Sequence, residues 1–347
     1  MIPWKYSKTM KYPNNNKKTA KFLAKTVLDL VGVDKSIDST FCELFGGLGY
    51  VSRELKPYVK NIIINDIEVY SSMINTAYMS VWIPRHIEKL LMSLNKNIGF
   101  KTGLIYKYYS SEGKITTPCF SPENAMKIDT IRTQITAWHK LGVINFDSYC
   151  YLLTSLLEAS VRVANIQHTF DSFNSPIHKR MYLPLELLPL DRKDDSGNFH
   201  IQRSCAKDYI NKIEGDVLFL NPPKSGCNYH INYHVLNTIC LYPKVEQVEM
   251  FGKFNKINYK FKHTPFHTKR KYLENMEFIL ANAKFKYIIL DCNKEICEPL
   301  HPILSKYGEF SILEHLYNIR VRDVARYRLK TTSQKHSYFY LLEKKGY

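Results

Sequence analysis

The stretch Asp216 to Lys224 contains a short apolar run, Val217 to Leu220, that stops abruptly at Asn221-Pro222-Pro223. A continuous apolar run of this length is typical of a strand that is buried on both faces. Proline cannot donate to a sheet ladder, so the two prolines end the strand at a fixed point. Because open α/β sheets bind ligands at the carboxyl ends of their strands, we predict that Asn221 faces a substrate.

A glycine-rich turn follows another candidate strand, Thr40 to Phe45. The turn is Gly46-Gly47-Leu48-Gly49, and Tyr50 to Leu55 is the expected helix after it. The order of strand, glycine turn and helix begins a nucleotide-type binding unit, in which glycines let the backbone approach a ligand at the positive end of a helix. On its own this pattern also occurs in tight turns that bind nothing.

A further strand, Val59 to Ile64, ends in Asn65-Asp66. A carboxylate at this point accepts hydrogen bonds from both hydroxyls of a ribose. Asp66 follows the glycine turn at about 20 residues, the separation expected for this pairing. The alternative is that Asp66 is a helix N-cap, and we favour the ribose interpretation.

Helical spacing of apolar residues predicts a first helix over Lys17 to Val31 and mostly helical structure from residue 70 to about 180. Within that region, Ser121-Pro122 are expected to begin a helix, and Asp147 is expected to cap the next one. The charged stretch Asp191 to Asn198 is expected to be a surface loop. Later strands are expected at 284–291, 310–316 and 337–342.

The formal net charge of +17 and the pI of about 9.3 favour an anionic partner, and nucleic acid above all. A lysine-rich surface that reflects a biased composition is the alternative. Basic residues gather around Tyr327 near the end of the chain, in a composition that suits a hairpin contacting phosphates. A solvated basic edge strand is equally consistent with it. The candidate DNA-binding residues are Arg320, Arg322, Arg326, Arg328 and Lys330.

The eight cysteines are scattered and form no C-x-x-C pair, which predicts reduced thiols in a cytoplasmic protein. Residues 1–18 are polar and basic, unlike a signal peptide, and no apolar run is long enough to span a bilayer. Two groups have spacings that a metal could use, but neither has a convincing fourth ligand, so no metal site is predicted. These groups are His263 with His267, and Cys292 with Cys297 and His301.

Together and in this order, the motifs resemble the S-adenosylmethionine-dependent N6-adenine DNA methyltransferases, specifically the Dam-like alpha group. The resemblance covers most of the chain. Phe45 to Gly49 resembles the family's F-x-G-x-G methionine-binding turn, and Asn221 to Lys224 occupies the place of its D-P-P-Y catalytic motif. Asn228-Tyr229 and Asn232-Tyr233-His234 are similar to the downstream Q-Y and N-Y-H motifs.

The resemblance implies a Rossmann-like α/β methyltransferase sheet with a mostly helical inserted region. Residues 1–72 and 200–347 would form the catalytic domain, and residues 73–199 the insertion that recognises the target. The implied cofactor-binding residues are Tyr12, Lys17, Glu43, Phe45, Gly47, Gly49, Asp66, Cys205 and Ala206. The implied catalytic residues are Asn221, Pro222, Pro223, Lys224 and Tyr229.

The implied reaction transfers a methyl group from S-adenosylmethionine to the exocyclic amine of an adenine that has left the DNA duplex. The implied partners are double-stranded DNA and either a second methyltransferase subunit or a cognate restriction enzyme. Asn221 replaces the usual aspartate, Cys205 stands where an acid contacting the cofactor adenine is expected, and Lys224 replaces the aromatic residue that stacks on the extruded base.

Two other functions stay open from the sequence alone. One is a degenerate methyltransferase subunit that binds DNA or a partner without transferring methyl groups, which Lys224 and Cys205 favour. The other is methylation of RNA or of a protein amide through the same Asn-Pro-Pro motif. The long helical insertion and the positive charge disfavour a protein substrate but are compatible with RNA.

Overall fold

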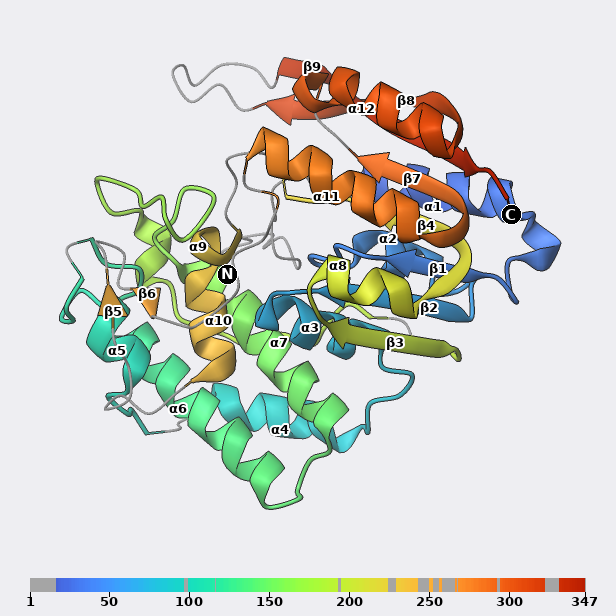
Figure 1. Cartoon of the computed structure of the whole chain (residues 1–347). Coiled ribbons are helices and arrows are strands. Elements are labelled where there is room, and N and C mark those ends of the chain that lie inside the picture. Colours follow the sequence, from blue (N-terminus) through green and yellow to red (C-terminus); the bar gives the residue numbers. More distant parts are fainter. Residues whose placement is uncertain are drawn as a thin grey trace. The chain divides into compact units, whose positions relative to one another are not determined.

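The computed structural model describes most of the chain. The described residues are 17–96, 99–115, 117–192, 195–223, 229–242, 250–251, 256–257, 266, 268–291, 294–321 and 331–346. They belong to two compact units (Figure 1). The sheet unit comprises Asn14–Ile67, Gly197–Gly226 and Thr264–Tyr347; the helical unit comprises Met1–Pro13, Glu68–Ser196 and Cys227–His263. The sequence analysis assigned catalysis to one domain and target recognition to the helical insertion, and these roles stay predictions.

The sheet unit contains a seven-stranded sheet with the order β3-β2-β1-β4-β7-β9-β8. Its strands are β1 (Thr40–Glu43), β2 (Asn61–Asp66), β3 (Asn198–Arg203), β4 (Glu214–Leu220), β7 (Lys284–Asp291), β8 (Gly308–Val321) and β9 (Thr331–Lys344). β1 pairs in parallel with β2 and β4, β2 with β3, and β4 with β7. β9 is antiparallel to both β7 and β8, so the strand direction reverses at β9 alone.

The apolar run of β4 is buried along its whole length, from Val217 to Leu220, as predicted for a strand covered on both faces. The strand β7 packs against helix α11 (Lys269–Asn282) through Phe285 and Ile288, which share a core cluster with Met276 and Ile279. Burial of each such side chain contributes about 1.5–3 kcal/mol, so this cluster fixes the central strands and thereby their carboxyl ends.

The other helices of the sheet unit flank these strands. They are α1 (Lys17–Val31), α2 (Tyr50–Leu55), α8 (Ala206–Tyr209) and α12 (Lys294–Tyr307), with short 3-10 turns at Val33–Lys35 and Ile210–Lys212. The predicted helix over Lys17 to Val31 is confirmed, and its buried face includes Leu23 and Val27.

The helical unit is built mainly from helices. They are α3 (Val69–Met79), α4 (His86–Asn95), α5 (Leu104–Tyr109), α6 (Pro122–Lys140), α7 (Phe146–Val163), α9 (Tyr229–Asn232) and α10 (His234–Leu241). A 3-10 turn at Lys179–Tyr182 and the short strands β5 (Met250–Phe251) and β6 (Lys256–Ile257) complete its described elements. As predicted, α6 begins with Ser121 as its cap, whose hydroxyl accepts from Asn124 N.

Three sequence predictions need correction. Asp147 does not cap α7, because Asn145 is the cap and its side-chain oxygen accepts from Ser148 N at 2.9 Å. The predicted loop ending at Asn198 runs straight into strand β3, an edge strand whose mostly polar residues gave no apolar signal. The strands expected at 310–316 and 337–342 exist but belong to a much longer hairpin, β8 and β9.

No helix in the described part of the chain is long and apolar enough to cross a membrane.

Candidate active site

The carboxyl ends of β1 and β4 lie side by side in the sheet. Glu43, the last residue of β1, is in register with Phe219 of β4, and Leu44 N donates to Phe219 O at 3.1 Å. The chain continues from β1 to β2 on one side, whereas β4 begins the other half of the sheet. This is a topological switch point, where open α/β sheets bind their ligands.

The glycine turn after β1 has the backbone that its sequence predicts. Gly47 has φ of 50° and Gly49 has φ of 63°, both in the left-handed region that favours glycine. Gly49 N donates to Gly46 O at 2.6 Å, which closes the turn before α2. Asp66, the last residue of β2, accepts from Gly47 N through Oδ2 at 2.7 Å. The proposed ribose acid and the turn are therefore joined directly.

Asn65 ties three strand ends together, a role that the sequence did not reveal. Its side-chain Nδ2 donates to Leu44 O at 3.1 Å and to Ser204 O at 3.2 Å. Its backbone oxygen accepts from Gly46 N at 2.8 Å. The side chain is almost fully buried, with 1% of its surface exposed. Loss of this amide would remove the bonds to Leu44 O and Ser204 O at once, while the backbone bond to Gly46 would remain.

Glu43, the last residue of β1, is buried. Its Oε2 accepts from Ser52 Oγ at 2.5 Å and from Ser52 N at 3.2 Å, so the carboxyl holds α2 against β1. Burial raises the pKa of Glu43 to about 7, although the hydrogen bonds from Ser52 act in the opposite direction. The described contacts of the Glu43 carboxyl are with Ser52 of α2, so a direct contact with the cofactor stays a prediction.

Glu43→Gln is expected to stabilise the protein at pH 8 and to have little effect at pH 4.5. The folded-state pKa of about 7 lies above the ordinary glutamate value of 4.5, so wild-type stability falls as the pH rises through this window. At about 1.4 kcal/mol per unit of pKa shift, the cost approaches about 3 kcal/mol. Urea denaturation at both pH values measures it, and an equal difference at the two values would contradict this assignment.

Cys205 and Ala206 follow β3, the neighbour of β2 at the same carboxyl edge. Cys205 is half-buried and caps α8, and Ser204 N donates to Asp66 O at 3.2 Å. The segment expected to contact the cofactor adenine thus begins beside the proposed ribose acid. A thiol in place of an acid removes a strong acceptor from this position.

Asn221, Pro222 and Pro223 follow β4 directly. Both prolines are buried, whereas Asn221 is half-buried. No residue in the described ranges hydrogen-bonds to the Asn221 side chain. Asn221 thus follows the strand that neighbours β1 in the sheet, and its role facing a substrate stays a prediction.

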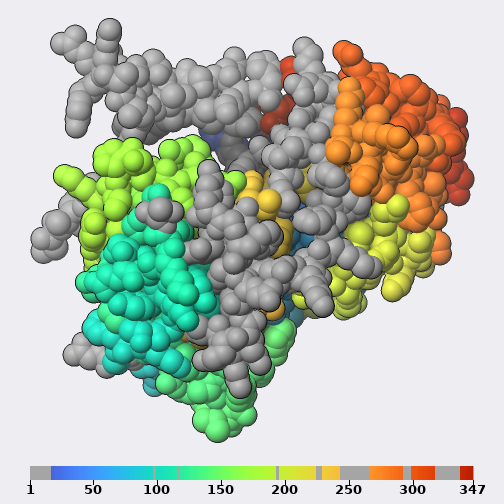
Figure 2. Space-filling view, turned by 60° about the vertical axis from the view of Figure 1, so that its left-hand side comes forward, coloured from blue at the N-terminus to red at the C-terminus, as the bar shows by residue number. Residues whose placement is uncertain are grey.

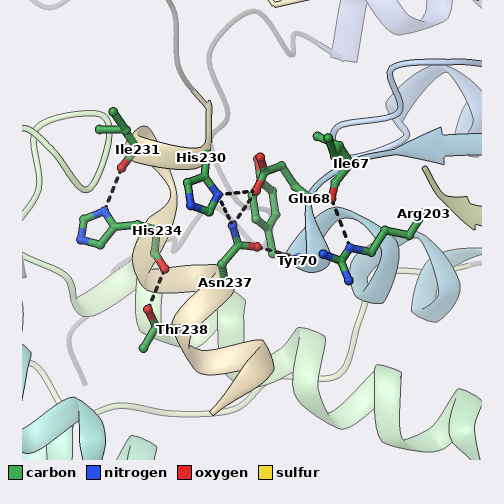
Figure 3. Close-up of polar contacts among 9 residues, drawn as sticks. All are labelled: Ile67, Glu68, Tyr70, Arg203, His230, Ile231, His234, Asn237 and Thr238. Carbon is green, nitrogen blue, oxygen red and sulfur yellow. Dashed lines mark hydrogen bonds and ion pairs between the residues drawn. The ribbon is translucent and has the colours of Figure 1, made fainter. Parts of the chain in front are cut away.

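Tyr229 belongs to the helical unit, where it begins α9. Its ring stacks on Tyr233, with centroids 6.2 Å apart and planes at 11°. Tyr233 in turn lies against Tyr70 of α3, at 5.6 Å between centroids. His234, the last residue of the N-Y-H motif, is buried with its Nδ1 at 2.8 Å from Ile231 O (Figure 3).

Several predicted site residues lie outside the described residues, namely Tyr12, Lys224, Arg322, Arg326, Arg328 and Lys330. The same holds for three of the residues considered as metal ligands, His263, His267 and Cys292. Arg320 lies on β8 opposite Thr332 of β9. Lys17 is exposed at the start of α1, and no described contact joins it to the glycine turn. A search confined to the described residues finds no metal-binding cluster of His, Cys, Asp or Glu.

The sheet is parallel except for one reversed strand near its edge, a glycine turn follows β1, and Asn-Pro-Pro follows β4. These three features define a Rossmann-like methyltransferase. A model of the D12 class N6 adenine-specific DNA methyltransferase family matches residues 25–299. The chain belongs to this family, as the resemblance in the sequence predicted, and is an adenine-specific DNA methyltransferase.

Relatives with assigned names agree with the family. The chain is 30% identical over 338 residues to the type II methyltransferase M.NlaIII of Neisseria lactamica, covering 96% of this chain and 99% of that protein. It is 28% identical over 330 residues to M.FokI of Planomicrobium okeanokoites, but spans only 48% of that protein. It is also 24% identical over 289 residues to M.CviAII of Paramecium bursaria Chlorella virus 1, covering 85% of it.

Proposed function

We propose that this chain takes a methyl group from S-adenosylmethionine, bound at the turn after β1, and transfers it to the N6 amine of an adenine held at Asn221. The observation that carries the proposal is the meeting of the two motifs at one switch point, with Leu44 N bonded to Phe219 O at 3.1 Å. A donor and an acceptor bound at adjacent strand ends are close enough for direct transfer.

The residues of the turn fit the cofactor. Two glycines with positive φ let the backbone approach a ligand, and the Asp66 carboxylate beside them supplies an acceptor for ribose hydroxyls. Cys205 and Ala206 would border the adenine, while Tyr12 and Lys17 would close over the methionine end. When bound, the cofactor supplies an electrophilic methyl group on a sulfonium.

Asn221 is proposed to make the adenine amine nucleophilic. The lone pair of this amine is delocalised into the ring, which weakens it as a nucleophile. If the Asn221 Oδ1 and the Pro222 carbonyl each accept one amine hydrogen, the nitrogen becomes pyramidal and its lone pair points at the methyl group. The same two acceptors stabilise the positive charge as it develops on the nitrogen.

Tyr229 is proposed to stack on the extruded adenine, because Lys224 cannot do so as an aromatic residue would. Base stacking offsets about 1–3 kcal/mol of the cost of extrusion, so Tyr229→Ala should slow transfer by about five- to 150-fold. Single-turnover rates at saturating cofactor measure the loss. Lys224→Tyr should keep or raise the rate, and Tyr58→Ala, at an exposed tyrosine of the sheet unit, should leave it unchanged. A wild-type rate in Tyr229→Ala would exclude this residue.

Duplex DNA is proposed to contact the β8–β9 hairpin and the surface around α5. The hairpin pairs over 308–321 with 331–344, whereas β7 pairs only with 339–343 of β9, so a two-stranded ribbon that includes Arg320 and Lys335 extends past the strand β7. Figure 2 shows the α5 region (teal) at the surface of the helical unit. There Lys107 and Lys114 Nζ lie 5.5 and 5.6 Å from the Tyr108 ring centroid.

Replacement of Arg326 and Arg328 by alanine should weaken DNA binding and flatten its salt dependence. Each lost phosphate contact reduces the slope of log K against log salt by about 0.9. Fluorescence anisotropy between about 50 and 200 mM salt measures the slope. Arg270→Ala with Lys271→Ala removes the same charge from α11 and should leave the slope unchanged. An unaltered slope in the hairpin variant would place the phosphate contacts elsewhere.

The proposed function is tested by transfer of labelled methyl groups to mixed-sequence duplex DNA, with RNA of matching sequence in parallel. Label in N6-methyladenine of the DNA alone supports the proposal. Label in RNA alone would replace it with RNA methylation, and no transfer at any DNA concentration would indicate a binding subunit. A second methyltransferase subunit or a cognate restriction enzyme is proposed as the partner, and co-expression of neighbouring genes tests it.

A further inference from the structure

We propose that Glu68 and Asn237 form a positioning pair that holds Tyr229 in place for transfer. The proposal rests on the function proposed above and adds to it a contact outside the predicted motifs. Asn237 lies on α10, the helix that continues from Tyr229 and the N-Y-H motif, and Glu68 lies immediately before α3. Both side chains are buried in the helical unit.

The contact is short, and the Asn237 amide uses both of its polar atoms (Figure 3). Asn237 Nδ2 donates to Glu68 Oε2 at 2.5 Å, and Asn237 Oδ1 accepts from Tyr70 N at 3.2 Å. His230 Nδ1 lies 3.4 Å from the same Glu68 oxygen. One amide thus binds both a carboxylate and a backbone N–H at the start of α3, which fixes the position of α10.

Glu68 stands at the N-cap of α3, yet its side chain makes no capping hydrogen bond to that helix. The residues that usually cap a helix through their side chains are Ser, Thr, Asp and Asn, and Glu is not among them. Here the carboxylate is directed to Asn237 of another helix instead.

The pair acts on Tyr229 through a column of rings. Tyr70, whose N–H binds Asn237, packs against Tyr233, and Tyr233 stacks on Tyr229. A shift of α10 along α3 therefore displaces the whole column. Misplacement of a reacting group by about 1 Å can slow a reaction by about 100-fold, so the pair is expected to affect the rate of transfer.

The far end of α10 is anchored separately. Arg132 Nε donates to Ile239 O at 2.6 Å and Arg132 Nη2 donates to Cys240 O at 2.7 Å. Loss of the Glu68 contact should therefore displace the helix without unfolding it. Variants at the pair remain suitable for kinetic measurements.

The experiment is a swap of the pair combined with a double-mutant cycle. Asn237→Asp keeps the acceptor for Tyr70 N but loses the donor to Glu68 and sets two carboxylates against each other. It should slow single-turnover transfer by about 10- to 100-fold, with the rate expressed per protein molecule that binds cofactor. The affinities for cofactor and DNA should stay within about twofold of wild type. Adding Glu68→Gln restores an amide–carboxylate contact and should recover most of the rate.

The cycle tests whether the pair acts through Tyr229. In the Tyr229→Ala background, Asn237→Asp should cost little further, whereas independent roles would give losses that multiply. Asn124→Asp is the matched control, because this buried amide lies in the same unit and binds only backbone groups of residues 181–185, donating to Met181 O and Leu183 O and accepting from Leu185 N. It should lower thermal stability and leave the rate per folded molecule unchanged.

The positioning role of Glu68 and Asn237 would be overturned if the rate losses of Tyr229→Ala and Asn237→Asp multiplied, or if the swap recovered no activity. Methyl transfer by the wild type would still uphold the proposed function in either case. A wild-type protein that transfers no methyl group would overturn both.

Discussion

Replacing Asn221 with alanine should reduce methyl transfer by a factor on the order of 100 to 1,000, close to complete loss. The substitution removes the side-chain oxygen that accepts from the adenine amine, while Pro222 keeps only its backbone acceptor. The described structure gives Asn221 no internal hydrogen bond to lose, so the fold and the affinity for cofactor should not change. Label transfer under single-turnover conditions, with cofactor affinity measured in parallel, separates these effects.

Asn61→Ala is the matched control. Asn61 is the first residue of β2, so it lies at the amino edge of the same parallel sheet, opposite the site. Its side chain makes one long contact, 3.4 Å from Nδ2 to Asp38 O. Wild-type activity is expected in this variant. Methylation that survives unchanged in Asn221→Ala would sink the assignment of the Asn-Pro-Pro segment as the catalytic centre.

Gly49→Asp should abolish cofactor binding. Gly49 has φ of 63° and ψ of 33°, where a side chain is strained, and the cofactor is proposed to lie beside its backbone. A carboxylate there would occupy space that the cofactor needs. Calorimetry should show a dissociation constant raised by at least about 100-fold. The thermal stabilisation by cofactor, about 2.7 kcal/mol at 100 times the wild-type dissociation constant, should disappear as well.

Gly32→Asp is the control, because it also places a side chain at a positive φ but lies outside the glycine turn. Gly32 has φ of 81°, and nothing lies within 4 Å of an added Cβ. It also belongs to the sheet unit, so it reports on strain alone. Cofactor affinity should stay at the wild-type value. Equal affinity in wild type and Gly49→Asp would place the cofactor elsewhere.

The strands that form the switch point were predictable because their signals are local. An apolar run that stops at two prolines gave β4, and a strand followed by three glycines gave β1 and its turn. The start of β2 was predicted two residues early, since Val59 precedes a strand that begins at Asn61. Periodicity identifies a strand more reliably than it places its ends.

Other parts of the site depend on contacts between residues far apart in the sequence. β3 escaped prediction because an edge strand with polar side chains has the composition of a loop. The position of Cys205 near Asp66 depends on the pairing of β3 with β2, so the sequence did not reveal it either. No spacing rule connects Glu68 to Asn237, because their contact exists only after α3 and α10 have packed.

The chain enters the helical unit between Ile67 and Glu68, immediately after β2, and again between Gly226 and Cys227, shortly after β4. In terms of gene exchange, this unit is not one cassette, because three segments of the chain contribute to it, Met1–Pro13 among them. A graft of residues 68–196 alone would separate Glu68 from the Asn237 with which it is paired. Recombination that gives the sheet unit a new helical partner must therefore take residues 68–196 and 227–263 from the same parent.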